Sequence, residues 1–66
     1  MKLYVVRKDG RYARSMFGEF GMQTKPRVGE CATYMYLYAA EYVAERLNAE
    51  VIEVKRGKGA ELEVVS

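Results

Sequence analysis

Residues 38–48 read Tyr-Ala-Ala-Glu-Tyr-Val-Ala-Glu-Arg-Leu-Asn and contain the clearest periodic pattern in the chain. Small and apolar side chains recur at helical spacing, at Ala39, Ala40, Val43 and Leu47. Polar side chains occupy the opposite side, at Glu41, Glu45 and Asn48. An amphipathic helix buries its apolar stripe against another element. The pattern therefore predicts a helix over residues 38–48 that covers part of a core.

The sequence after this helix predicts a β-hairpin. Apolar and charged residues alternate on both sides of residues 57–59, which read Gly-Lys-Gly. Such alternation is typical of strands with one buried face, and Gly59 suits the left-handed position of a three-residue loop. On this register the expected facing pairs are Val54 with Leu62, Ile52 with Val64, Lys55 with Glu61, and Glu53 with Glu63.

The sequence before the helix begins with a second hairpin signal. Residues 2–7 are rich in Tyr and Val, and an Asp9-Gly10 pair separates them from residues 12–17. Both central residues of a type I′ turn need positive φ, which Asp and Gly tolerate best. The expected facing pairs are Val6 with Ala13, Val5 with Arg14, Tyr4 with Ser15, and Leu3 with Met16. The expected core face carries Tyr4, Val6, Ala13 and Phe17.

Two segments connect the first hairpin to the helix. Residues 18–29 contain three Gly and one Pro and show no sustained period, which predicts a loop and a candidate working surface. Tyr residues alternate with other apolar residues over 32–38, which favours a short strand at 32–36. A helical stripe through Ala32, Tyr36, Ala40 and Val43 leaves a longer helix, starting near residue 30, as the alternative. Together the elements predict an α+β fold over residues 1–66, with one helix on a mostly antiparallel sheet.

This arrangement resembles small uncharacterised proteins of phage and prophage genomes. The likeness is carried by Leu-Tyr-Val-Val-Arg-Lys-Asp-Gly-Arg-Tyr-Ala, Ala-Thr-Tyr-Met-Tyr and Ala-Ala-Glu-Tyr-Val-Ala-Glu-Arg-Leu-Asn-Ala-Glu-Val-Ile-Glu-Val, within residues 3–54. Those proteins look like a hairpin, a short strand, a helix and a final strand. The resemblance implies an accessory protein that acts on a host factor in the host cytoplasm, and it implies no catalytic or binding residues.

Composition limits the classes of protein to consider. A 66-residue chain with one Cys and no His forms no internal disulfide and offers too few ligands for structural zinc. No export signal or membrane-spanning stretch is visible, so we expect a cytoplasmic protein without a membrane partner. A domain this small buries little surface, which favours a homo-oligomer.

The sequence predicts no catalytic residue, no cofactor site and no metal site. His, the usual general base, is absent. Cys31 lacks a group that would lower its pKa, so a small buried thiol is the expected role. Glu41 and Glu45 are expected on a solvated helix face rather than as an acid and base pair. We therefore expect a protein that is not an enzyme.

Charge is distributed unevenly along the chain. Residues 1–29 carry seven Lys or Arg and two acidic residues, a net charge of +5, and residues 30–66 carry four and seven, a net charge of −3. A solvated surface accounts for both halves. The alternative is a small nucleic-acid-binding domain, because Lys and Arg neutralise phosphates and aromatic rings stack on bases. Its candidate residues are Arg7, Lys8, Arg11, Arg14, Lys25 and Arg27.

Tyrosine is the most unusual component, with six residues and no Trp. Tyr is enriched where protein interfaces gain most of their binding energy, because it buries a ring and still offers a hydroxyl. The same rings could also enlarge a small core. The sequence thus favours a module that binds a protein partner or itself. The candidate partner-binding residues are Phe20, Lys25, Arg27, Tyr34 and Tyr38.

Overall fold

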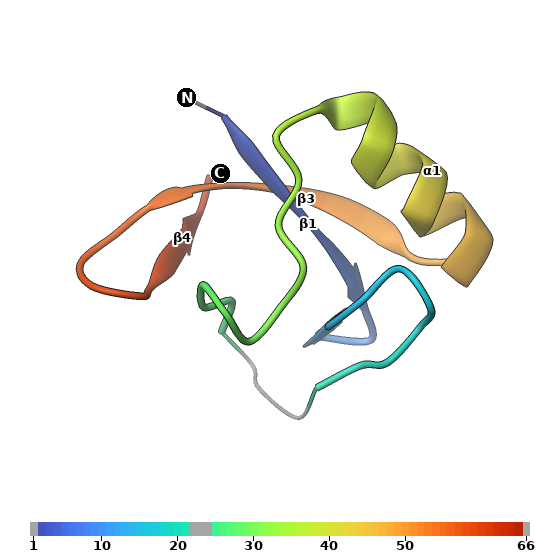
Figure 1. Ribbon diagram of the computed structural model, residues 1–66, viewed down its shortest axis with the longest axis horizontal. Coiled ribbons are helices and arrows are strands. Elements are labelled where there is room, and N and C mark those ends of the chain that lie inside the picture. Colours follow the sequence, from blue (N-terminus) through green and yellow to red (C-terminus); the bar gives the residue numbers. More distant parts are fainter. Residues whose placement is uncertain (1, 22–24, 66) are drawn as a thin grey trace.

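The computed structural model describes residues 2–21 and 25–65, which form one helix and four antiparallel strands (Figure 1). The elements are β1 (Leu3–Lys8), β2 (Arg11–Tyr12), α1 (Leu37–Leu47), β3 (Glu50–Arg56) and β4 (Leu62–Val64). The strand order in the sheet is β2-β1-β3-β4. α1 packs against β1 and β3 on one face of this curled sheet. The α+β fold expected from the sequence is confirmed.

The predicted helix is confirmed with its bounds moved by one residue. α1 buries Ala40, Val43 and Ala44 and ends where Asn48 takes a left-handed conformation with φ of 55°. The backbone N–H of Asn48 donates to the carbonyl oxygen of Glu45, which closes the last turn. Residues 30–36 are not helical, so the longer-helix alternative is wrong.

The first hairpin has the predicted turn but not the predicted length. Asp9 and Gly10 both have positive φ, 53° and 77°, as a type I′ turn requires. The Ala13 N–H donates to the Val6 carbonyl oxygen at 2.9 Å, so the pairing starts in the expected register. It then stops, because the N–H of Arg14 donates to the carbonyl oxygen of Glu19 and the chain turns back on itself.

Tyr34 occupies the place beside β1 that Ser15 was expected to take. Two backbone hydrogen bonds of 2.8 Å join Tyr4 and Tyr34. The predicted pairs Tyr4 with Ser15, Leu3 with Met16 and Val5 with Arg14 are therefore wrong. The strand expected over 32–36 is reduced to this single bridge.

β1 contributes to apolar clusters on both faces of the sheet. Val6 packs with Ala13, Val43 and Ala44 under α1. On the other face the cluster consists of Val5, Tyr12, Cys31, Val54 and Leu62. The expected single core face is thus wrong in part, because Val5 is fully buried and Phe17 is 78% exposed.

The second hairpin forms with its register shifted by two residues. Val54 faces Val64, Lys55 faces Glu63 and Arg56 faces Leu62. A shift of two keeps every side chain on its face, so alternation alone cannot exclude it. The observed register avoids the expected contact between Glu53 and Glu63, because the N–H of Val65 donates to the Glu53 carbonyl oxygen instead. Gly59 has the expected positive φ, 59°.

The segment expected as a loop over 18–29 pairs with the sheet at both of its described ends. Phe20 bridges to Ala13 next to β2. Farther along, the N–H of Val28 donates to the carbonyl oxygen of Ala60 at 2.7 Å. The N–H of Leu62 donates to the carbonyl oxygen of Pro26 at 3.1 Å. Residues 22–24 lie outside the described residues. The curled sheet is therefore extended beyond β4 by residues 26–28.

Candidate protein-binding surface

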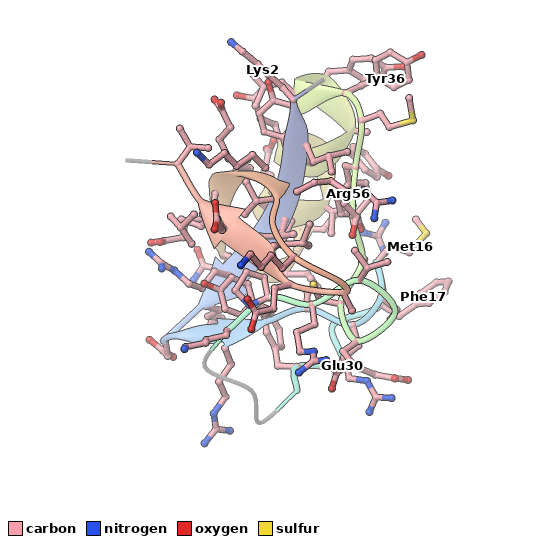
Figure 2. The ribbon with its side chains drawn as sticks, turned by 90° about the vertical axis from the view of Figure 1, so that its left-hand side faces the viewer. Lys2, Met16, Phe17, Glu30, Tyr36 and Arg56 are labelled. Carbon is pink, nitrogen blue, oxygen red and sulfur yellow. The ribbon has the colours of Figure 1, made fainter. Side chains whose placement is uncertain are left out.

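A group of large apolar side chains is exposed beside α1. The exposed fractions are 42% for Met16, 78% for Phe17, 59% for Tyr36, 71% for Tyr38 and 57% for Tyr42. Met16, Phe17 and Tyr36 project from the same side of the molecule (Figure 2). Together with the half-buried Tyr34, these residues form what we call the tyrosine surface: Met16, Phe17, Tyr34, Tyr36, Tyr38 and Tyr42.

A groove of about 630 Å³ lies at the centre of the tyrosine surface. Its lining is almost entirely carbon and comes from three segments of the chain. The lining residues are Met16, Tyr34, Tyr38, Ala39, Tyr42 and Val43. Tyr34 is positioned by its backbone pairing with Tyr4, and burial raises the pKa of its phenol. Met16 is brought to the helix by the turn over residues 14–19. The groove therefore depends on tertiary structure as well as on α1.

Ring contacts order the exposed tyrosines. Tyr36 and Tyr38 stack with their ring centroids 5.5 Å apart. Arg46 lies 5.7 Å from the centroid of the Tyr42 ring, and its Nη1 atom donates to the Tyr42 hydroxyl at 3.4 Å. Such contacts restrict the rotamers of side chains that would otherwise move freely in water, which lowers the entropy lost when a partner covers them.

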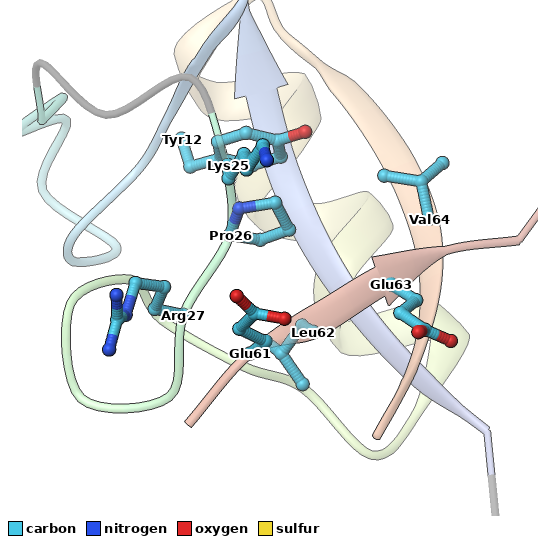
Figure 3. Close-up of a pocket in the computed structure, with 8 residues that line it drawn as sticks. All are labelled: Tyr12, Lys25, Pro26, Arg27, Glu61, Leu62, Glu63 and Val64. Carbon is cyan, nitrogen blue, oxygen red and sulfur yellow. The ribbon is translucent and has the colours of Figure 1, made fainter. Parts of the chain in front are cut away.

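A second cleft lies on the sheet face away from α1, between residues 25–27 and β4 (Figure 3). It has a volume of about 600 Å³. Lys25 extends toward Tyr12 in this cleft, whereas Arg27 points away and forms an ion pair of 2.9 Å with Glu30. The lining residues are Tyr12, Lys25, Pro26, Arg27, Glu61, Leu62, Glu63 and Val64.

The residues predicted to bind a partner are thus divided between different sites. Tyr34 and Tyr38 line the groove, and Lys25 and Arg27 belong to the second cleft. Phe20 is half-buried and packs against the cluster under α1. The prediction missed Met16 and Tyr42. Tyr42 could have been found from its position one helical turn after Tyr38, on the polar side of the predicted helix.

Several of the basic residues proposed for nucleic acid have partners within the chain. The guanidinium of Arg7 donates to Glu50 at 2.6 and 3.0 Å, and this hydrogen bond is the main cause of the raised pKa of Arg7. The ammonium of Lys8 donates to the Leu47 carbonyl oxygen at 3.3 Å. Arg11, Arg14 and Lys25 are exposed. The six basic side chains are therefore not all equally available to bind phosphates.

Cys31 has the environment of a structural thiol. It is buried, and its Sγ donates to the Arg27 carbonyl oxygen at 3.4 Å. Burial raises the pKa of the thiol, so its nucleophilic thiolate form is disfavoured at neutral pH. Within residues 2–21 and 25–65, no three His, Cys, Asp or Glu side chains are grouped closely enough to hold a metal ion. The same residues include no helix long and apolar enough to cross a membrane.

Comparison with known proteins gives no relative from which a role could be transferred. No protein-family profile matches the sequence, and neither a curated protein nor a solved structure matches it significantly.

Proposed function

We propose that this chain is a protein-binding module whose contact area is the tyrosine surface. The observation that carries the proposal is the carbon-lined groove framed by Met16, Tyr34, Tyr38 and Tyr42. The five exposed members of the tyrosine surface present an area on the order of 600 Å² if each fully exposed side chain presents about 200 Å². The largest apolar patch on a typical monomer covers about 300–600 Å² and is often functional. The tyrosine surface lies at the upper end of this range.

The chemistry of the surface favours a protein over other ligands. Tyr and Met are enriched at the centres of protein interfaces, where rings are packed and hydroxyls find partners at the edge. A phosphate backbone would need cations, but the groove lining has none. Binding through this surface would use apolar contact at the groove and hydrogen bonds from the tyrosine hydroxyls.

A capture experiment with paired variants tests the proposal. The chain would be immobilised and exposed both to an excess of its own untagged copies and to a cell lysate. The Tyr38→Ser/Tyr42→Ser variant removes the exposed rings from α1. The matched control, Val64→Ser/Val65→Ser, also removes exposed apolar side chains but lies near the end of the chain at β4.

We expect the wild-type chain and the valine control to retain protein, and the tyrosine variant to lose most of that retention. Circular dichroism would show that all three chains are folded, because the substituted side chains are exposed. Equal retention by the wild type and the tyrosine variant, or no retention from either source, would contradict the proposal.

A further inference from the structure

Many of the large side chains of this protein lie on its surface. Tyr12 and Leu62 are buried, but the other buried hydrophobic residues among those described are Val, Ala and Cys. Phe17 and Tyr38 are larger and are more than two-thirds exposed. A small domain gains stability when a partner covers such rings, and a second copy of the same chain is a partner that is always present with it.

The exposed stripe of α1 is complementary to itself. Tyr38, Tyr42 and Arg46 follow one another at intervals of four residues, so their Cα atoms are about 6 Å apart along the helix axis. When a second helix runs antiparallel across a two-fold axis at Tyr42, Tyr38 of each copy faces Arg46 of the other. The two-fold symmetry then gives two equivalent contacts, each between the guanidinium of Arg46 in one copy and the ring of Tyr38 in the other.

From this complementarity we infer that the tyrosine surface is the interface of a homodimer, in which the α1 helices of two copies pack antiparallel about Tyr42. The inference rests on the proposed function and identifies the partner as the chain itself. Each copy contributes an area on the order of 600 Å², or about 1,200 Å² in total, which is the lower end for specific complexes. The net charge of +2 on each copy adds little repulsion. The dimer should therefore form and also dissociate on dilution.

Sedimentation equilibrium over about a hundredfold range of concentration measures this association. The wild-type chain should pass from monomer to dimer with rising concentration. Arg46→Ala should weaken dimerisation about tenfold, because it removes two symmetry-related contacts with the Tyr38 ring of the other copy and the contacts that Arg46 makes with Tyr42 in its own chain. The matched control, Lys58→Ala, removes an exposed cation at the tip of the second hairpin and should leave dimerisation unchanged.

Disulfide crosslinking tests the geometry independently. Tyr42→Cys places two thiols at the two-fold axis, so mild oxidation should join two copies in high yield. Lys58→Cys places a thiol at another exposed position, far from the axis, and should give little crosslinking. The native Cys31 is buried, so it should not contribute in either variant.

The outcomes separate this inference from the proposed function. A wild-type chain that stays monomeric, but whose capture of lysate protein still requires Tyr38 and Tyr42, would overturn the homodimer and leave the protein-binding module standing. A dimer that neither crosslinks through Tyr42→Cys nor responds to Arg46→Ala would also overturn the inference. Absence of both self-association and tyrosine-dependent capture would overturn both proposals.

Discussion

Gly18 shows how one residue positions the tyrosine surface. It ends the turn that carries Met16 and Phe17, and its φ of 92° is unfavourable for any residue with a Cβ. A Cβ at this position would lie 3.0 Å from the Cδ2 atom of Leu47 on α1. The turn can approach the helix this closely because residue 18 has no side chain.

We predict that Gly18→Ala lowers the free energy of unfolding by about 1–2 kcal/mol, from the cost of positive φ plus the contact with Leu47. The matched control is Gly59→Ala, where φ is also positive but no atom lies within 4 Å of the added Cβ. The control should lose only about 1 kcal/mol. Urea denaturation of both variants measures the difference, and an equal loss in the two would show that the contact with Leu47 does not matter.

Cys31 predicts a loss of stability in alkaline solution. Burial raises its pKa above the ordinary thiol value of 9.0, so the unfolded chain loses the proton at a lower pH than the folded chain. The stabilising effect is complete below pH 9 and decreases as pH rises toward the raised pKa of the folded state. Tyr34 adds a similar effect at higher pH, because burial raises its pKa above 10.0.

Denaturation at about pH 8 and about pH 10 should therefore show a larger decrease for the wild type than for Cys31→Ala. The Ala variant keeps the contribution of Tyr34, which both chains share. A decrease of the same size in the two chains would mean that the thiol of Cys31 has no raised pKa in the folded state.

At the level of elements, the register of the second hairpin is open to a direct test. Lys55 lies 3.8 Å from Glu63, and both side chains are mostly exposed. Glu63→Lys places two cations opposite each other and should cost about 0.5 kcal/mol at low salt, with less effect at high salt. Glu61 faces Arg27 instead, so the salt-dependent cost of Glu61→Lys should persist when Lys55 is replaced by Ala, whereas that of Glu63→Lys should disappear. Thermal unfolding of the two variants, with and without Lys55→Ala, at two salt concentrations distinguishes the observed register from the one that the sequence predicted.

The elements also show which parts of the fold could be predicted from sequence. The Asp9-Gly10 turn and the helix were predictable because each depends on neighbours close in the chain. The pairing of Tyr4 with Tyr34 joins residues far apart in sequence, and no local pattern indicates it. The hairpin register was ambiguous because strands repeat every two residues.

The candidate site was predictable to a similar extent. Tyr content indicated Tyr34 and Tyr38 as candidate contact residues, although their outward position was expected from a helix starting near residue 30, whereas α1 starts at Leu37. Met16 reaches the groove only because the chain turns back after Ala13, whereas the sequence favoured a continued strand there.

At the level of the whole molecule, nucleic-acid binding stays a prediction that salt can test. Four phosphate contacts on duplex DNA would give a slope of log affinity against log salt of about −3.6. The Arg11→Ala/Lys25→Ala variant would reduce the magnitude of this slope by about 2. We expect neither result, because Arg7, Lys8 and Arg27 already have partners within the chain. Tight duplex or single-strand binding at low salt, with a steep slope, would contradict the proposal that this protein binds protein and not nucleic acid. The host factor implied by the resemblance to phage proteins likewise stays a prediction.

NMR chemical-shift mapping tests the central claim, that this protein meets its partner through the tyrosine surface, most directly. Backbone amide spectra would be recorded across a dilution series of the wild-type chain. We expect concentration-dependent shifts to concentrate at residues 15–18, at Tyr34 and along the exposed side of α1, while the shifts of Glu61 and Val64 in the second cleft stay constant. Shifts confined to the second cleft and the 25–28 segment would contradict it.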